Sequence, residues 1–306
     1  MQKLCLALLL AAAVLTACST SSINMPALDG AADGNRLPGK FIWHELITDT
    51  PEKTKRFYNE LFGWEFESLA DKRINYSLIR HNGEAIGGMI DQNQLPNQAD
   101  ISQWVALLAV ADIDNATEQL ANSGGTVFTP PTSLGSRGQI AVVADPQGAL
   151  FAFLQTNEGD PADKQELPSY GNFFWHELWT QEIDSAVNFY SQFAPYQMEP
   201  VLMGTEEDPI DYVVMNAQEQ KRGAIRENPF EGLPSIWVNY LRLADHAELE
   251  SILARVETLG GEILVPAVVR PGGGTVAVIA GPSGAGIALQ TWPDEALAAQ
   301  LTEKNP

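Results

Sequence analysis

The sequence is poor in basic residues. Its 306 residues include 18 Lys and Arg against 39 Asp and Glu, and the formal net charge is −21. Nucleic acid is bound mainly through Lys and Arg, so this balance argues against a nucleic-acid partner. It also argues against attraction to an anionic lipid surface by charge alone. The surplus of carboxylates fits either cationic ligands or solubility alone.

Cysteine and long apolar runs are scarce as well. The two cysteines, Cys5 and Cys18, lie near the N-terminus, so the body of the chain has no disulfide framework. The apolar run at residues 4–15 is too short to span a bilayer stably and has the length of a signal-peptide core. We therefore expect a signal peptide over residues 1–17.

Residues 15–18, Leu-Thr-Ala-Cys, resemble the bacterial lipoprotein box. The resemblance implies cleavage before Cys18, a diacylglyceryl thioether on its sulfur and an acylated new N-terminus, so that Cys18 anchors the protein to a lipid bilayer. The alternative is an ordinary secretory peptide with an unmodified cysteine. Ser19 after the cysteine favours the outer membrane, facing the periplasm, by the same resemblance. Residues 18–39 are predicted to be a flexible tether.

A long internal repeat organises the rest of the chain. Residues 41–46 read FIWHEL and residues 173–178 read FFWHEL, and the stretches 41–67 and 173–199 pair without a gap. Each copy predicts a strand, then a helix with Phe-Tyr on its apolar face. A repeat of this length indicates duplicated architecture.

The apolar periodicity predicts four β-α-β-β-β units. Two units make a domain at 40–156 and two make a domain at 172–293, with a linker at 157–171 and a tail at 294–306. Thr50 is the expected N-cap of the first helix, and Asp245 with Glu248 has capping-box spacing at the fourth. Strands are expected to begin at Trp64 and to span 126–129, among others.

Four such units resemble the vicinal oxygen chelate superfamily, which includes glyoxalases, bleomycin resistance proteins and extradiol dioxygenases. The resemblance rests on residues 50–64, residues 110–114, Gly-Gly after the second helix, and Asp-Pro-x-Gly-Ala at 145–149. It implies an α+β fold in which paired units form a cup-shaped mixed sheet with helices outside. It also implies a small-molecule site in each cup.

Metal-dependent members of this superfamily hold a divalent ion with His or Glu on the first strand of a unit and Glu on its last strand. In this chain those positions carry apolar residues: Trp43, Trp175, Val105, Val238, Ala152 and Ala288. We predict no metal site and no other cofactor. His44 and His176 share the opposite strand face, and we interpret them as buried, hydrogen-bonded packing residues on the helix side; a ligand or general-base role is the alternative.

Trp43 with Glu45, and Trp175 with Glu177, are the predicted ligand-binding pairs. Alternation places each Trp and Glu on one strand face, which suits a cationic or hydrogen-bond-donating ligand if that face lines the cup. A structural role for the carboxylates is the alternative. Two further candidates alternate on the first strand of the fourth unit and favour polar recognition in the second cup: Tyr240 and Arg242.

The sequence therefore predicts a lipid-anchored periplasmic protein that binds an unidentified small molecule without a metal. No catalytic residue is predicted. One alternative is a divergent lyase, isomerase or dioxygenase, including a metal-free isomerase with Glu45 or Glu177 as base. Another is a non-catalytic envelope scaffold whose cups are filled with side chains. Neither the ligand nor an oligomeric state follows from the residues.

Overall fold

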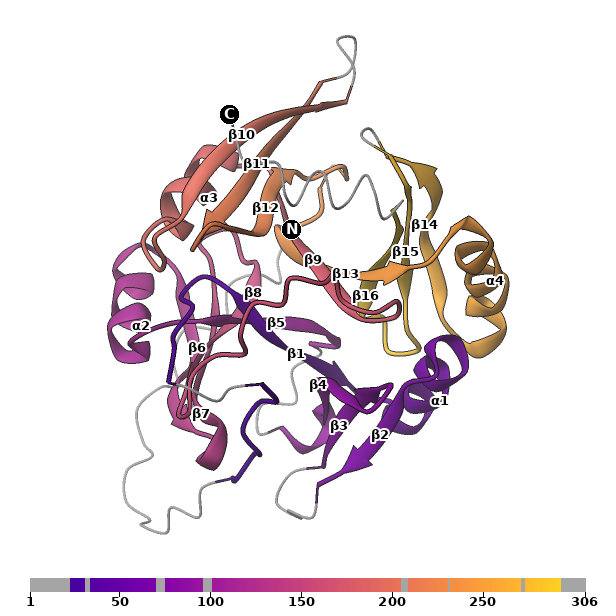
Figure 1. The fold of residues 1–306 in the computed structure, drawn as a ribbon, viewed down its shortest axis with the longest axis horizontal. Coiled ribbons are helices and arrows are strands. Elements are labelled where there is room, and N and C mark those ends of the chain that lie inside the picture. Colours follow the sequence, from indigo (N-terminus) through magenta and orange to yellow (C-terminus); the bar gives the residue numbers. More distant parts are fainter. Residues whose placement is uncertain are drawn as a thin grey trace, which may run out of the picture.

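A computed structural model describes residues 23–30, 34–69, 75–95, 101–204, 209–230, 232–270 and 273–292. These residues form two domains, each built on one eight-stranded sheet (Figure 1). Cys18, the expected signal peptide at 1–17 and the expected tail at 294–306 lie outside the described residues. Within the described part of the chain, no helix has the length and apolar character needed to cross a bilayer.

The first domain contains two consecutive units. Its first unit consists of β1 (Phe41–Thr48), α1 (Pro51–Phe62), β2 (Glu65–Ser68), β3 (Tyr76–His81) and β4 (Glu84–Asp91), followed by the 3₁₀ turn η1 (Gln92–Gln94). The second unit consists of β5 (Gln103–Ala109), α2 (Ile113–Asn122), β6 (Thr126–Ser133), η2 (Gly135–Arg137), β7 (Gly138–Ala144) and β8 (Leu150–Thr156).

The second domain repeats this order. Its first unit consists of β9 (Phe173–Thr180), α3 (Ile183–Tyr190), β10 (Gln197–Gly204), β11 (Pro209–Ala217) and β12 (Gln220–Glu227). Its second unit consists of β13 (Ile236–Leu243), α4 (His246–Val256), η3 (Glu257–Leu259), β14 (Glu262–Val269), β15 (Thr275–Ala280) and β16 (Gly286–Thr291).

The two sheets have the same strand order, β2-β3-β4-β1-β5-β8-β7-β6 and β10-β11-β12-β9-β13-β16-β15-β14. In each unit the first strand pairs in parallel with the last, as β1 does with β4 and β5 with β8. The first strands of the two units pair antiparallel, as β1 does with β5. The predicted α+β fold, with four β-α-β-β-β units paired into two domains, is confirmed.

The residues predicted to begin helices and strands agree with the structure at some elements and differ from it at others. Asp245 caps α4 by accepting from the backbone N–H of Glu248 at 2.8 Å, as its spacing predicts. Thr50 occupies the N-cap position of α1, as predicted, but its side chain makes no cap bond. Trp64 does not begin a strand: it is fully buried, and its Nε1 donates to the carbonyl of Gly171 at 3.1 Å.

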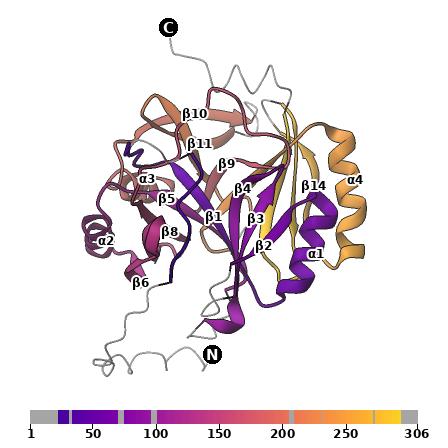
Figure 2. The same cartoon turned by 60° about the horizontal axis from the view of Figure 1, so that its bottom comes forward.

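The helix-bearing faces of the two sheets pack against each other, through helices at the sides and through strands at the centre. α1 lies beside α4, and α2 lies near α3 (Figures 1 and 2). The Arg255 guanidinium on α4 contacts the Glu60 carboxylate on α1 at 3.6 Å. One core includes the apolar faces of α2 and α3, and a second includes those of α1 and α4. Each of these cores therefore belongs to both domains.

His44 and His176 meet at the centre of this interface. Their Nε2 atoms are 2.8 Å apart and their rings are parallel within 6°. His44 stacks on Phe173 and His176 stacks on Phe41, so the two halves are arranged symmetrically. The interpretation as buried, hydrogen-bonded packing residues is confirmed. The contact that the sequence did not predict is the one between the histidines themselves, across the domain interface.

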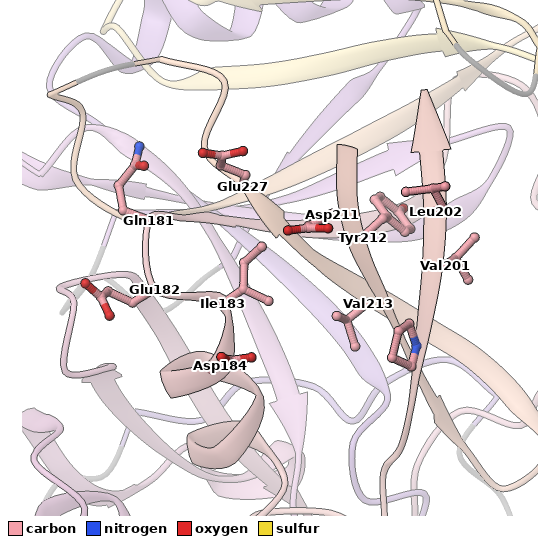
Figure 3. Close-up of a pocket in the computed structure, with 11 residues that line it drawn as sticks. Gln181, Glu182, Ile183, Asp184, Val201, Leu202, Asp211, Tyr212, Val213 and Glu227 are labelled. Atoms are coloured by element: carbon pink, nitrogen blue, oxygen red, sulfur yellow. The ribbon is translucent and has the colours of Figure 1, made fainter. Parts of the chain in front are cut away.

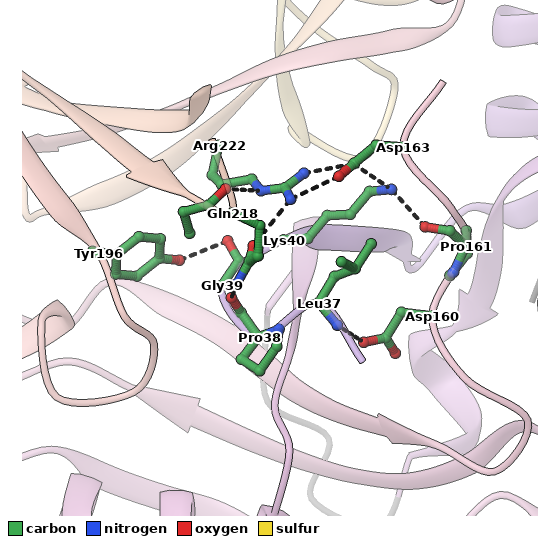
Figure 4. Close-up of polar contacts among 11 residues, drawn as sticks. Leu37, Pro38, Gly39, Lys40, Asp160, Pro161, Asp163, Tyr196, Gln218 and Arg222 are labelled. Carbon is green, nitrogen blue, oxygen red and sulfur yellow. Dashed lines mark hydrogen bonds and ion pairs between the residues drawn. The ribbon is translucent and has the colours of Figure 1, made fainter. Parts of the chain in front are cut away.

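A polar cluster ties residues 34–40 and the linker to the second domain (Figure 4). Asp163 of the linker pairs with Lys40 at 3.0 Å and with both Nη atoms of Arg222 at 2.6 and 2.8 Å. The Tyr196 hydroxyl donates to the carbonyl of Gly39 at 2.7 Å. The linker is therefore held at a defined place between the domains.

The N-terminal strap, residues 23–30, differs from the expected free tether. Met25 and Leu28 are 4% and 5% exposed and pack against the first sheet. The backbone N–H of Met25 donates to Leu134 at 2.8 Å, and Arg137 N–H donates to the Met25 carbonyl at 3.1 Å. In Figure 1 this indigo segment lies between β7 and β3. Three apolar side chains of the strap, Ile23, Met25 and Leu28, join the apolar cluster of the first sheet and explain the packing.

Candidate functional site

A buried carboxylate lies at the centre of the first cup, the face of the first sheet that points away from the helices. Glu45 on β1 is 5% exposed. Its Oε1 accepts from Trp43 Nε1 at 2.8 Å, the Tyr76 hydroxyl at 2.9 Å and Arg137 Nη1 at 3.3 Å. Its Oε2 is buried and has no hydrogen-bond partner among the described residues. Strand alternation places Trp43 and Glu45 on this face together.

The environment of Glu45 opposes its charge. Burial raises the pKa of this carboxyl from 4.5 to about 7, although Arg137 and the bonds from Tyr76 and Trp43 act in the other direction. The Arg137 guanidinium also lies 4.6 Å from the ring centroid of Trp43. A carboxyl with a pKa near neutrality and an unused oxygen can accept a hydrogen bond or a proton from a ligand.

The second cup carries the corresponding carboxylate in a saturated network. Glu177 on β9 is fully buried. Its Oε1 accepts from the Tyr212 hydroxyl at 2.9 Å and from Arg270 Nη2 at 2.8 Å. Its Oε2 accepts from Trp179 Nε1 at 3.0 Å and from the Tyr240 hydroxyl. Both oxygens are therefore satisfied by protein donors.

The extra donors give Glu177 the opposite titration behaviour. Burial alone raises its pKa, but the charges of Arg270 and Arg226 and the bond from Tyr240 outweigh burial, and the pKa falls to about 2. Glu177 is therefore held as an anion, whereas Glu45 lies near its midpoint at neutral pH. The two cups are chemically unequal, as the sequence predicts.

The structure brings most of the predicted site residues together. Trp43 bonds to Glu45 directly, and Tyr240 bonds to Glu177. Trp175 reaches Glu177 through Tyr212, since its Nε1 donates to that hydroxyl at 2.9 Å. Arg242 instead contacts the linker. Its Nη1 donates to the carbonyl of Pro168 at 2.7 Å, and its guanidinium lies 4.3 Å from the ring centroid of Tyr170.

Sequence reasoning missed five members of the two networks: Tyr76, Arg137, Trp179, Tyr212 and Arg270. The tyrosines occupy equivalent places in the two sheets, since Tyr76 pairs with Ile90 of β4 and Tyr212 pairs with Arg226 of β12, but both lie beyond the gap-free repeat. Arg137 is the only basic residue between positions 101 and 156 of an acidic chain. Such an isolated cation in an apolar unit indicates a buried pair, because a lone buried charge is costly.

A hollow of about 200 Å³ lies between the N-terminal strap and the first sheet. Trp43 and Arg137, which both contact Glu45, line it. The strap covers it with Pro26, Ala27, Leu28 and Asp29, and the other lining residues are Glu67, Leu69, Leu78, Arg80 and Ala85. Small-molecule sites are commonly about 300–1,000 Å³, so the covered hollow is smaller than most.

A larger groove of about 730 Å³ lies between the start of α3 and the strands β10 and β11 (Figure 3). Neither Glu177 nor Arg270 lines it. Its lining includes four carboxylates and no Lys or Arg: Glu182, Asp184, Asp211 and Glu227. These acidic side chains are exposed. The groove therefore belongs mainly to the outer surface, and Tyr212 is the residue that it shares with the network around Glu177.

The residues present do not fit a divalent ion in either cup. The first-strand and last-strand positions carry Trp43, Val105 and Ala152 in the first domain, none of which is a metal ligand. No group of three His, Cys, Asp or Glu capable of holding a metal occurs among the described residues. An Arg side chain contacts each central carboxylate, where it supplies the positive charge.

The first domain matches the family model described as "Glyoxalase/Bleomycin resistance protein/Dioxygenase superfamily" over residues 40–153. The first domain belongs to this superfamily. The second domain repeats its strand order, so the chain carries the glyoxalase fold twice. This confirms the family that the sequence motifs indicate.

Two kinds of relative share sequence with this glyoxalase-fold chain. The Mycobacterium tuberculosis protein named "Putative glyoxylase CFP32" is 26% identical over 245 residues, which cover 79% of this chain and 91% of that protein. The Streptomyces peucetius protein named "Anthracycline biosynthesis protein DnrV" is 27% identical over 170 residues, or 50% of this chain and 59% of that protein.

Solved structures share the fold at lower identity. The Mn(II)-bound glyoxalase from Novosphingobium aromaticivorans superposes with a TM-score of 0.53 at 15% identity, covering 84% of this chain and 82% of its own. The 2,2',3-trihydroxybiphenyl 1,2-dioxygenase from Sphingomonas wittichii also has a TM-score of 0.53 at 15% identity, covering 84% and 91%. At this identity the likeness shows the fold alone.

Proposed function

We propose that this chain is a lipid-anchored, periplasm-facing protein that binds a small molecule in its first cup. The observation that carries the proposal is Glu45 Oε2, a buried acceptor that has no hydrogen-bond partner in the part of the chain that the structure describes. Two neighbours of Glu45, Trp43 and Arg137, line the hollow beside it. A ligand that places an N–H or O–H donor on Oε2 would satisfy this atom, which otherwise carries the full cost of desolvation.

The walls of the hollow favour a largely apolar or aromatic ligand with one polar end. Trp43, Leu69, Leu78 and Ala85 supply apolar surface, and Arg137 supplies an aligned positive charge beside the acceptor. The second cup fits a structural role better, because every oxygen of Glu177 already has a donor. This reverses the sequence-based preference for the second cup.

Glu45 also favours a second candidate function, metal-independent proton transfer. Its pKa of about 7 lies in the range where a carboxylate works as a general base at neutral pH. Arg137, 3.3 Å from Oε1, would stabilise negative charge that develops on the substrate after a proton moves to Oε2. The mycobacterial relative with "glyoxylase" in its name supports an isomerase or lyase of this kind.

The test is native mass spectrometry of the full-length protein extracted from the membrane fraction of a bacterial host. We expect a bound small molecule on the wild type and its loss in Glu45→Gln. The matched control is Glu118→Gln, an exposed carboxylate on α2, which lies on the opposite face of the first sheet from the cup. Replacing Cys18 by Ala is expected to move the protein from the membrane fraction to the soluble periplasmic fraction.

Two results would count against the proposal. A Cys18→Ala protein that stays in the membrane fraction contradicts lipid anchoring. A bound molecule that persists unchanged in Glu45→Gln places the ligand elsewhere. If the molecule is converted by the wild type and bound intact by Glu45→Gln, the proton-transfer function is the correct one.

A further inference from the structure

The N-terminal strap occupies the mouth of the first cup. It places Met25 and Leu28 in the apolar cluster that contains Trp43 and Tyr76. Its residues 26–29 form one wall of the hollow. The strap therefore covers the hollow that Trp43 and Arg137 line.

The strap is attached by the buried side chains of Met25 and Leu28 and by a short set of polar contacts. Two backbone hydrogen bonds join Met25 to Leu134 and Arg137, and one side-chain bond runs from Arg137 Nε to the carbonyl of Pro26 at 3.1 Å. Asn24 Oδ1 accepts from the backbone N–H of Ser136 at 2.8 Å. The strap is not part of the eight-stranded sheet, and its ordering is opposed by the conformational entropy of every residue it fixes.

Arg137 links the strap to Glu45. One end of its guanidinium bonds to the strap through Nε, and Nη1 bonds to Glu45 Oε1 and to the Tyr76 hydroxyl at 3.0 Å. Release of the strap frees Nε of Arg137 while the Glu45 contact remains. The opened cup then presents the N–H donor of Arg137 beside the Trp43 ring, with Glu45 held directly behind Arg137.

We propose that the N-terminal strap is a lid that closes the first cup and must leave before a ligand can enter. This inference rests on the proposed function in one respect, the first cup as the ligand site. The opening of the lid does not depend on that function. It predicts that the closed and open forms exchange in the folded protein, so that the lid opens far more often than the sheet unfolds.

Gly135 provides a variant that displaces the lid without touching the inside of the cup. A Cβ built on Gly135 would lie 2.8 Å from Asn24 Cα and 2.1 Å from Asn24 Oδ1. Gly135 has a φ of +65°, so an alanine there is also strained. Gly63 is the matched control, because its φ is +71° and a Cβ there meets nothing within 4 Å.

The experiment compares the wild type, Gly135→Ala and Gly63→Ala as full-length protein. Hydrogen exchange followed by mass spectrometry reports the lid through the amides of Met25 and Arg137, and the sheet through the β1 amides. In the wild type we expect the lid amides to exchange at least on the order of tenfold faster than β1. Gly135→Ala should raise lid exchange further, and Gly63→Ala should leave it at the wild-type rate.

Cup access is measured with the dye 1-anilinonaphthalene-8-sulfonate, whose aromatic rings suit Trp43 and whose sulfonate suits Arg137. We expect dye fluorescence to rise severalfold in Gly135→Ala and not in Gly63→Ala. The dye should protect β3 and β7 from exchange in Gly135→Ala alone. Protection of other strands, or no rise in fluorescence, would overturn the proposal.

The outcomes separate the lid from the proposed function. If lid and β1 amides exchange together in the wild type, the strap is a permanent part of the fold and the lid is refuted, whether or not a ligand co-purifies. If the lid opens and admits the dye but no molecule is found on wild-type protein, the lid stands and the proposed ligand-binding function loses its support.

Discussion

Glu45 and Glu177 show how two equivalent residues acquire opposite properties. Both lie on the first strand of a domain, beside an arginine and a tyrosine. Glu177 has one donor more, Tyr240, where the first cup has Leu107 in the same register. The shorter arginine contact, the added charge of Arg226 and that hydroxyl together keep Glu177 ionised.

The raised pKa of Glu45 predicts a pH-dependent stability. Its folded pKa of about 7 exceeds the unfolded value of 4.5, so the folded state binds this proton more tightly, and stability falls as the pH rises from 4.5 to 7. Glu45→Gln removes this pH-dependent loss of stability, because a glutamine side chain does not titrate. Between pH 5 and pH 8 the variant should gain about 2–3 kcal/mol relative to the wild type, measured by urea unfolding.

Glu177→Gln is the paired variant and should behave differently. Its folded pKa of about 2 lies below 4.5, so its stabilising contribution is present above pH 4.5 and disappears as the pH falls towards 2. Removing the charge also leaves Arg270 buried without its partner. We expect a loss of about 3–5 kcal/mol at pH 7. Equal effects of the two variants at pH 7 would contradict the inequality of the cups.

The sequence predicted the carboxylates of the site better than their partners. The Trp-His-Glu repeat and strand alternation were sufficient to place Trp43 with Glu45. Tyr76 and Arg137 come from other strands and connections, and they meet Glu45 only because the sheet curls. Arg242 shares a strand face with Tyr240, but the linker offers its guanidinium a carbonyl and an aromatic ring, so alternation alone misplaced it.

At the scale of elements, periodicity predicted the four units because each helix and strand buries one regular face. Boundaries failed where tertiary contacts decided them. β6 runs to Ser133, beyond the expected 126–129, because the edge of a sheet tolerates Pro130 and Pro131. The N-terminal strap was missed because a few apolar residues make no periodic pattern.

Helix caps offer a direct test at this scale. The Asp245 side chain accepts from Glu248 N–H, so Asp245→Ala should lower the free energy of unfolding by about 1 kcal/mol. Thr50 occupies the corresponding position before α1 without a side-chain cap bond, and Thr50→Ala is the matched control. Chemical denaturation of both variants checks the difference. An equal loss in the two would show that the cap bond of Asp245 contributes nothing.

At the scale of the whole molecule, the two domains are one folding unit. Both large cores draw side chains from each domain, and His44 and His176 pair at their centre. The cups consequently face away from each other, and each can specialise without disturbing the shared interior. In the first cup, Glu45 Oε2 has no hydrogen-bond partner among the described residues. In the second cup, both oxygens of Glu177 accept hydrogen bonds.

The histidine pair makes this interface sensitive to acid. Burial lowers the pKa of both rings, with mutual repulsion adding to the effect at His44, and the pKa of His176 falls to about 3. Below pH 6.5 the two histidines bind protons in the unfolded chain but not in the folded chain, where both rings are buried. Stability is therefore lost as the pH falls from 6.5 towards 3, and His176 alone contributes about 1.4 kcal/mol per pH unit.

This loss exceeds the gain from Glu45 over the same interval, because two rings resist protonation and only one carboxyl gains a proton, so the wild type should lose stability between pH 7 and pH 5. The double variant His44→Gln/His176→Gln keeps a hydrogen-bonding side chain at each position but removes the titration. We expect it to be less stable at pH 7.5, because the ring stacking is lost. It should then gain stability as the pH falls to 5, because only Glu45 still titrates in this network. Urea unfolding at several pH values gives the slope, and a variant with the wild-type slope would show that the pair does not titrate with folding.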